Sequence, residues 1–79
     1  MDRAELEKKV IEFVATSYKK DPSEITLDTT FGDELGGSSR QMVALVALIE
    51  NELEALVPMR EASASKTVRD LVDRVEEGL

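Results

Sequence analysis

The sequence predicts an all-α fold, a small three-to-four-helix bundle with a long first loop. Three segments, at residues 3–18, 39–56 and 68–78, carry apolar residues at the three- and four-residue steps of an amphipathic helix. No segment shows convincing strand alternation, and the 79 residues contain no internal repeat or second hydrophobic unit. We therefore expect one domain over residues 1–79, because a bundle is the economical way to bury three amphipathic helices.

The first helix is expected over residues 3–18, where charged residues separate the apolar ones. Lys19 and Lys20 suit its C-terminal end, where cations are favourable, and the Asp-Pro step that follows ends it. We expect this helix to be structural. Its apolar face consists of Leu6, Val10, Phe13, Val14 and Tyr18.

Residues 21–38 are expected to form a long loop. A loop of this length in a compact domain is usually functional or held down by its side chains. Three acidic residues in it do not have the spacing of an EF-hand calcium loop, so we expect solvated carboxylates and no metal site. The apolar residues spaced to reach the core and hold the loop are Ile25, Leu27, Phe31 and Leu35.

The start of the second helix is the candidate site. Gly36 and Gly37 let the backbone turn, and either Ser38 or Ser39 can cap the helix while the other lies beside it. A hydroxyl there lies near backbone N–H groups that have no intrahelical partner and near the positive end of the helix dipole. A phosphate ester on that hydroxyl would therefore be held rather than repelled.

The second helix, expected over residues 39–56, has two distinct faces at about 100° per residue. One face is the expected core stripe: Met42, Leu45, Val46, Ile49, Leu53 and Leu56. The other begins at the serines and mixes small apolar groups with charged ones, as a transient docking surface does. We call it the docking face, and it consists of Arg40, Val43, Ala47, Glu50 and Glu54. The alternative is an ordinary solvated face with two incidental apolar residues.

A linker at residues 57–66 separates this helix from the last one. Pro58 is expected to end the second helix, Met59 to dip into the core, and a short helical turn to form around residues 60–63. In the last helix, at 68–78, Thr67 and Asp70 form a variant of the capping box, and Gly78 stands at its natural end. Its apolar residues are Val68, Leu71, Val72, Val75 and Leu79.

The composition excludes several kinds of catalyst. The chain has no histidine and no cysteine, so neither a Ser/His/Asp triad nor a Cys/His zinc site is available. We expect a substrate or carrier and not an enzyme, since a hydrolase using Ser39 would lack a base. No apolar run is long enough to span a bilayer, and Asp2 and Glu5 argue against a signal peptide. We expect a cytoplasmic monomer.

The acidic charge is concentrated around the candidate site. The chain carries a net charge of −7, and residues 28–57 account for −5 of it. Nucleic acid and anionic membrane are therefore not expected as partners, whereas basic patches on other proteins are.

These residues resemble the acyl carrier proteins and the related peptidyl carrier proteins. The family signature is a serine preceded by Leu-Gly-x-Asp (or His), with an aromatic residue earlier in the loop. Here Phe31, Leu35, Gly36 and Ser39 occupy the corresponding places, and the resemblance runs without a gap from Phe31 onward. The other matching positions are Met42, Val43, Leu45, Val46, Ile49 and Leu53, the Val57-Pro58 step, and Thr67-Val68.

The resemblance implies that a separate phosphopantetheinyl transferase attaches 4′-phosphopantetheine from coenzyme A to Ser39 and not to Ser38. Gly37, Ser38 and Arg40 would flank the attached group. The terminal thiol of this group would carry an acyl group as a thioester. The resemblance also implies acyl-transferring or synthase enzymes with basic docking surfaces as partners.

Three positions depart from the family pattern. Ser38 replaces the usual acid or histidine, Arg40 replaces the usual leucine, and Ala44 stands where fatty-acid carriers often have an acid. These changes favour a specialised carrier, in lipid or polyketide-type biosynthesis, over the housekeeping one.

The Gly36-Gly37 pair also resembles peptidyl carriers, so a peptidyl or aminoacyl carrier remains an alternative. An unmodified carrier-like interaction module, in which Ser39 only caps the helix, is a second one.

Overall fold

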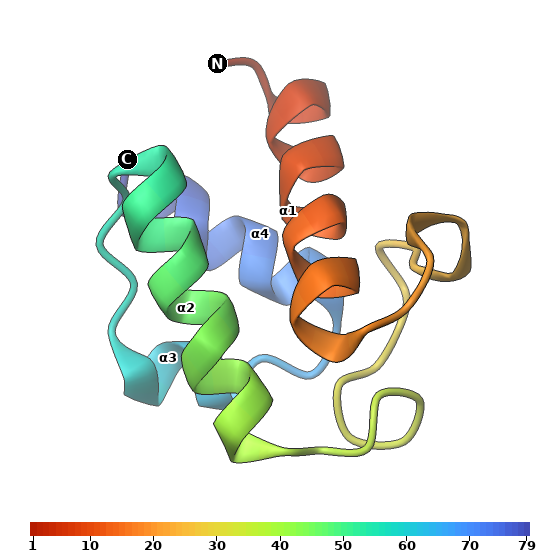
Figure 1. The fold of residues 1–79 in the computed structure, drawn as a ribbon. Helices are drawn as coiled ribbons and strands as arrows, with labels where there is room; N and C mark the ends of the chain where they lie inside the picture. Colours follow the sequence, from red (N-terminus) through yellow and green to blue (C-terminus); the bar gives the residue numbers. More distant parts are fainter.

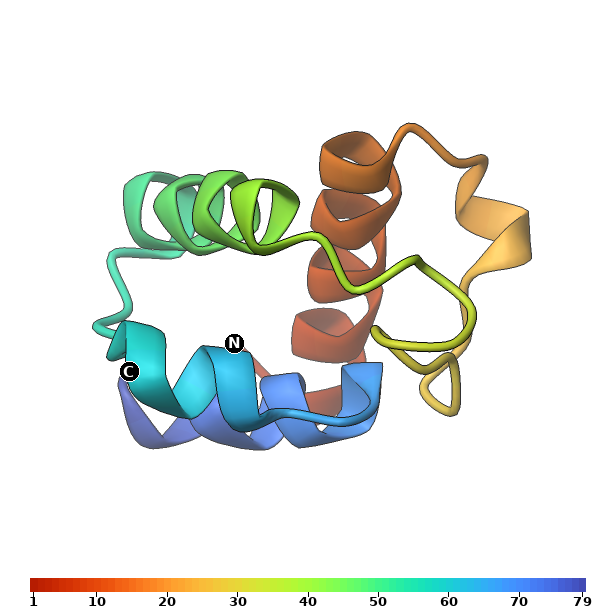
Figure 2. The same ribbon diagram turned by 90° about the horizontal axis from the view of Figure 1, so that it is seen from below.

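A computed structural model describes all residues from 1 to 79 and shows four α-helices around one core. They are α1 (Arg3–Tyr18), α2 (Ser39–Leu53), α3 (Met59–Ala64) and α4 (Val68–Glu77), with a short 3-10 helix, η1 (Pro22–Glu24), in the long first loop. Helix α1 packs against both α2 and α4. The short α3 lies at the end of the bundle and contacts α2 and α4 (Figures 1 and 2). The structure contains no β-strand, and its one isolated bridge joins Thr30 to Thr67. The expected all-α bundle is confirmed.

Helix α1 begins and ends where its sequence predicts. The Asp2 carboxylate caps the start by accepting a hydrogen bond from the Glu5 N–H at 2.8 Å. Lys19 ends the helix in the left-handed conformation, with φ of 56°, and its N–H bonds the carbonyls of Ala15 and Thr16. The helix therefore ends in a left-handed backbone turn at Lys19. The positive charge of Lys19 near the negative end of the helix dipole adds to the effect of this turn.

Helix α2 ends three residues earlier than expected, and the reason is not Pro58. Its last residue is Leu53, after which Glu54 adopts a left-handed conformation with φ of 54°. This turn changes which side of the chain faces inward, so Leu56 is 72% exposed although its spacing predicted a core position. The neighbouring Ala55 and Val57 are buried in its place.

The connection after α2 also differs from expectation. The short helical turn is confirmed and extends over the six residues of α3. Met59 is 37% exposed and does not enter the core, whereas Ala62 is fully buried. Leu79 is also exposed, because α4 ends at Glu77 and the final residue continues past the bundle.

The long loop is held by its apolar side chains and by backbone hydrogen bonds. Ile25 and Phe31 are buried, while Leu27 and Leu35 pack against the core from half-buried positions, which confirms the predicted anchors. The loop backbone also pairs with the start of α4. The Phe31 N–H donates to the Lys66 carbonyl at 3.0 Å, and the Val68 N–H donates to the Thr29 carbonyl at 3.0 Å. The loop is therefore tied to α4 before it delivers the chain to α2.

Candidate functional site

Two left-handed glycines lead the chain into α2. Gly36 has φ of 88° and Gly37 has φ of 64°, a region that side chains with a Cβ rarely adopt. The Gly37 N–H donates to the Phe31 carbonyl at 2.8 Å, which folds this part of the loop back on its buried anchor. The expected role of the glycine pair in turning the chain is confirmed, and the turn places the two serines at the start of the helix.

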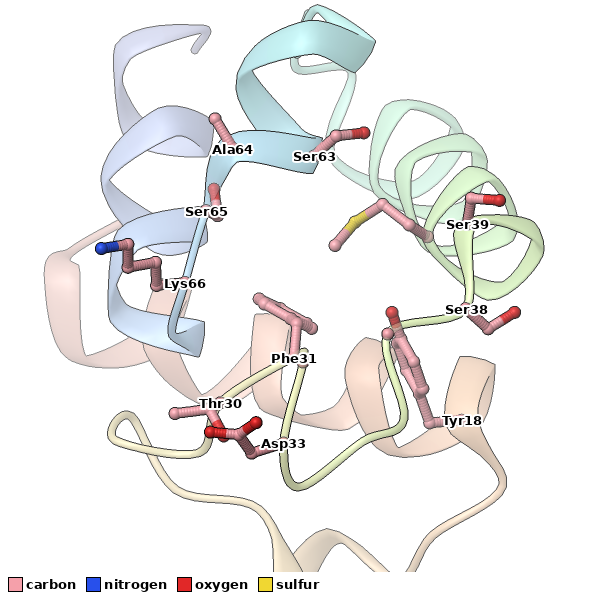
Figure 3. Close-up of a pocket in the computed structure, with 13 residues that line it drawn as sticks. Tyr18, Thr30, Phe31, Asp33, Ser38, Ser39, Ser63, Ala64, Ser65 and Lys66 are labelled. Carbon is pink, nitrogen blue, oxygen red and sulfur yellow. The ribbon is translucent and has the colours of Figure 1, made fainter.

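Ser38 and Ser39 have different positions at this helix start. Ser38 is the N-cap residue, and its Oγ accepts a hydrogen bond from the Gln41 N–H at 3.4 Å. Ser39 is the first helical residue; it is exposed, and its hydroxyl makes no hydrogen bond within the chain. In Figure 3 both hydroxyl oxygens point away from Phe31, at the edge of the neighbouring pocket. Of the two serines that could cap the helix, the structure thus assigns capping to Ser38, and the cap at Ser39 that the unmodified-module alternative required is not formed.

The first turn of α2 offers positive charge and free hydrogen-bond donors. The backbone N–H groups of Ser39 and Arg40 have no acceptor in the chain. No acidic residue occupies this turn, and the exposed Arg40 forms no ion pair. Free N–H groups at a positive helix end are the usual environment of a bound phosphate. These residues therefore fit a phosphate ester on the Ser39 hydroxyl.

A pocket of about 430 Å³ lies beside the serines, between the start of α2, the end of α3 and the long loop (Figure 3). The rings of Phe31 and Tyr18 are inclined to one another, with their centroids 6.0 Å apart. Burial raises the pKa of Tyr18, so its phenol is neutral at physiological pH. Tyr18 was predicted only as part of the apolar face of the first helix, and it lines this pocket as well. The residues that line it are Tyr18, Thr30, Phe31, Gly32, Asp33, Gly37, Ser38, Ser39, Met42, Ser63, Ala64, Ser65 and Lys66.

The contribution of α3 to this pocket was not predicted, because residues 57–66 were expected to be a linker. Ser63 and Ser65 belong to the end of this segment, where the small residues alanine and serine alternate along the chain. That run of small side chains was the available signal, since small residues let a backbone come close to its neighbours. Its meaning depended on how the chain folds back after Leu53, which brings α3 beside the start of α2.

The residues of the docking face lie along the outside of α2. Val43 is 54% exposed, Arg40, Ala47 and Glu54 are exposed, and Glu50 is half-buried. None of the three charged residues forms an ion pair within the chain. The structure therefore leaves their charges available to solvent, and partner binding at this face remains a prediction.

The remaining acidic residues do not gather into a metal site. Asp28 pairs with Arg69 at 2.5 Å, and Glu34 interacts with Thr30 in its own loop. Nowhere do three side chains of the metal-binding types, including aspartate and glutamate, come together. None of the helices has both the length and the apolar character needed to cross a bilayer.

Comparison with known proteins adds independent information. Residues 8–75 match the family model described as the phosphopantetheine attachment site. The acyl carrier protein of Clostridium perfringens (strain 13 / Type A) is 38% identical over 69 residues, which cover 87% of this chain and 91% of that protein. The acyl carrier protein of Porphyromonas gingivalis (strain W83) is 36% identical over 76 residues, covering 96% of this chain and 97% of its own length.

A third relative, the acyl carrier protein of Rickettsia canadensis, is 40% identical over 72 residues, covering 91% of this chain and 84% of the relative. Acyl carrier proteins are carriers and not catalysts, and they interact with synthases and transferases. The resemblance seen in the sequence is thus confirmed over nearly the whole chain. The chain belongs to the acyl carrier protein family, whose prosthetic group is covalently attached 4′-phosphopantetheine.

Proposed function

We propose that this chain carries an acyl group as a thioester on 4′-phosphopantetheine attached to the Ser39 Oγ. The observation that carries the proposal is the state of the Ser39 hydroxyl. It is exposed, it has no hydrogen-bond partner in the chain, and it stands in the first turn of α2 beside free backbone N–H groups. Ser38 is the only other serine at this helix end, and its Oγ is already engaged by the Gln41 N–H.

Each neighbouring residue has a separate role at this site. Ser38 caps α2, which leaves the Ser39 oxygen free for a transferase. The N–H groups of Ser39 and Arg40 are free to donate to a phosphate oxygen on Ser39, and Gly37 supplies the turn that presents the helix end. When bound, the prosthetic group supplies the thiol that carries the acyl group.

The acyl cargo is proposed to belong to a specialised pathway, of the lipid or polyketide type. Ser38 caps α2, Arg40 lies in its first turn, and no acid is present there, so enzymes that require negative charge beside the modified serine are poorly matched to it. An acyl cargo is favoured over an aminoacyl one because the relatives reported above are named acyl carrier proteins. We also propose that residues 1–79 act as a single carrier domain.

Intact-mass measurement tests this function. The wild-type chain, Ser38→Ala and Ser39→Ala are each incubated with coenzyme A and a panel of phosphopantetheinyl transferases. We expect a single phosphopantetheine adduct on the wild type and on Ser38→Ala, and none on Ser39→Ala. A conventional acyl carrier protein incubated in parallel shows that each transferase is active.

Two results would contradict the proposal. An adduct that persists in Ser39→Ala would place the attachment elsewhere. No adduct with any transferase that loads the control carrier would favour an unmodified interaction module. The cargo class is then read from the mass of the loaded group on protein isolated from its own cells.

A further inference from the structure

We propose that the docking face is electrically polarised, and that the enzymes which act at Ser39 present an acidic group opposite Arg40 and basic groups opposite Glu50 and Glu54. This inference rests on the proposed function, because it takes Ser39 as the point to which the partners come. It goes further by specifying the charge pattern of the partner surface. A partner that is basic throughout would meet Arg40 with a like charge.

The charges on α2 are separated into two groups. Arg40 lies in the first turn, Glu50 lies in the last turn, and Glu54 follows the helix end. Residues 41–49 between them carry no charge. At a rise of about 1.5 Å per residue, Arg40 is about 15 Å from Glu50 along the helix axis. This separation exceeds the Debye length of about 8 Å at physiological ionic strength, so a partner senses the two ends separately.

Arg40 stands where a cation is unfavourable to the chain itself. The start of a helix is its positive end, and no acid in this first turn offsets the guanidinium. Arg40 forms no ion pair and no side-chain hydrogen bond within the chain. Arg60 is also unpaired, whereas Arg3, Arg69 and Arg74 pair with carboxylates. Of the two unpaired arginines, only Arg40 lies on α2. A residue that opposes a local rule without internal compensation is expected at a functional surface.

The middle of the docking face suits close approach by another protein. Val43 is 54% exposed and Ala47 is also exposed, as is Ala44 beside them. These side chains are small and uncharged, and they lie between Arg40 and Glu50. An apolar centre bounded by charges is the usual anatomy of a protein interface. Because the two ends carry opposite signs, a partner turned end for end would meet like charges at both, and this fixes its orientation.

The test measures binding directly to the transferase that loads the wild-type chain most efficiently. Binding is measured without coenzyme A and with every variant carrying Ser39→Ala, so that no phosphate group takes part. On this background Arg40→Glu is expected to weaken binding about tenfold at low salt, chiefly through slower association, and the difference shrinks as salt rises. Arg40→Lys keeps the charge and is expected to bind within about twofold of the parent.

Two further variants complete the design. Glu50→Lys is expected to weaken binding at low salt as well, because it puts a cation opposite a basic group. Lys8→Glu is the matched control. It makes the same cation-to-acid change as Arg40→Glu, but on α1, in a separate groove lined by Ile11, Pro22 and Leu27. We expect Lys8→Glu to bind within about twofold of the parent, because its charge lies outside the docking face.

The stability of Arg40→Glu separates docking from folding. An acid in the first turn is favourable to the helix, so this variant is expected to melt at a temperature equal to or above that of the parent. Weaker binding by a protein that is at least as stable cannot come from unfolding.

Three results would overturn the inference. Equal or tighter binding by Arg40→Glu would show that partners read the whole face as acidic. An equal loss in Lys8→Glu would show an effect of net charge alone. Loss of loading by Arg40→Glu with Ser39 intact, together with unchanged binding on the Ser39→Ala background, would assign Arg40 to the phosphate. Failure of the proposed function looks different, since no transferase would then load the wild-type chain while loading a control carrier.

Discussion

The hydroxyl groups of Ser38 and Ser39 belong to adjacent residues but have different surroundings. The Ser38 Oγ accepts the Gln41 N–H at 3.4 Å and so satisfies one of the donors at the start of α2. The Ser39 hydroxyl bonds nothing in the chain and is exposed. At the scale of single residues, the helix cap thus uses one oxygen and leaves its neighbour free, which is the basis of the proposed attachment to Ser39.

This division predicts opposite results for two alanine variants. Ser38→Ala is expected to lower the free energy of unfolding by about 0.5–1 kcal/mol, because a helix cap is lost, and to keep the phosphopantetheine adduct. Ser39→Ala is expected to change it by less than about 0.5 kcal/mol, as for other exposed residues, and to lose the adduct. Urea denaturation of the unmodified proteins measures the first quantity. The reverse order of stability would show that Ser39 is the true cap.

The start of α4 shows how one element is held by its cap. The Thr67 Oγ1 accepts the Asp70 N–H at 3.3 Å, and the Asp70 carboxylate accepts the N–H groups of Thr67 and Lys66 at 3.2 and 3.1 Å. The predicted capping box is therefore confirmed. The bond from the Thr67 N–H is the main reason why the pKa of Asp70 lies below its usual value of 3.8.

The lowered pKa predicts how this cap responds to acid. A carboxyl whose pKa is lower in the folded state than in the unfolded state adds stability above pH 3.8, and this contribution is lost as the pH falls through the folded value. Wild type is expected to be more stable than Asp70→Asn at pH 7, and the difference is expected to decline below about pH 4. Urea denaturation at pH 7, 5 and 3 measures it. A difference that stays constant down to pH 3 would contradict the prediction.

At the scale of the whole molecule, the end of α4 closes against the chain that leaves α2. The Leu56 N–H donates to the Gly78 carbonyl at 3.2 Å, and a Cβ on Gly78 would lie 2.2 Å from the Leu56 carbonyl oxygen. Gly78 has φ of −91°, which any residue can adopt. A glycine is therefore needed here for the close approach of two backbones, in addition to the predicted role of ending the helix.

This contact predicts a large effect of a small change. Gly78→Ala is expected to lower the free energy of unfolding by about 1–3 kcal/mol, because the added methyl group displaces the chain after α2. Gly32→Ala is the control, since nothing lies within 4 Å of its Cβ position, and it is expected to be neutral or slightly stabilising. Thermal or urea denaturation compares the two. Equal stability of both variants would show that the chain around Leu56 moves aside without cost.

Local signals in the sequence determined much of this protein. The apolar spacing and the caps located α1 and α4 to within one residue, and the loop anchors Ile25 and Phe31 were found because apolar side chains in a long loop have few places to go but the core. The glycine pair and the serines marked the candidate site because turn-forming and helix-capping residues are also local signals. Helical periodicity, caps and positive-φ glycines act over a few residues, and those residues are adjacent in the sequence.

Only the tertiary structure decided which serine caps α2, where α2 ends, and what lines the pocket beside Ser39. The helical spacing continues through Leu56, and a left-handed residue such as Glu54 leaves no mark in that pattern. The exposed position of Met59 and the approach of α3 to the start of α2 depend on contacts between separate elements of the fold. Such contacts are set by how the helices pack around a common core, and the spacing of residues along one segment does not encode the position of another.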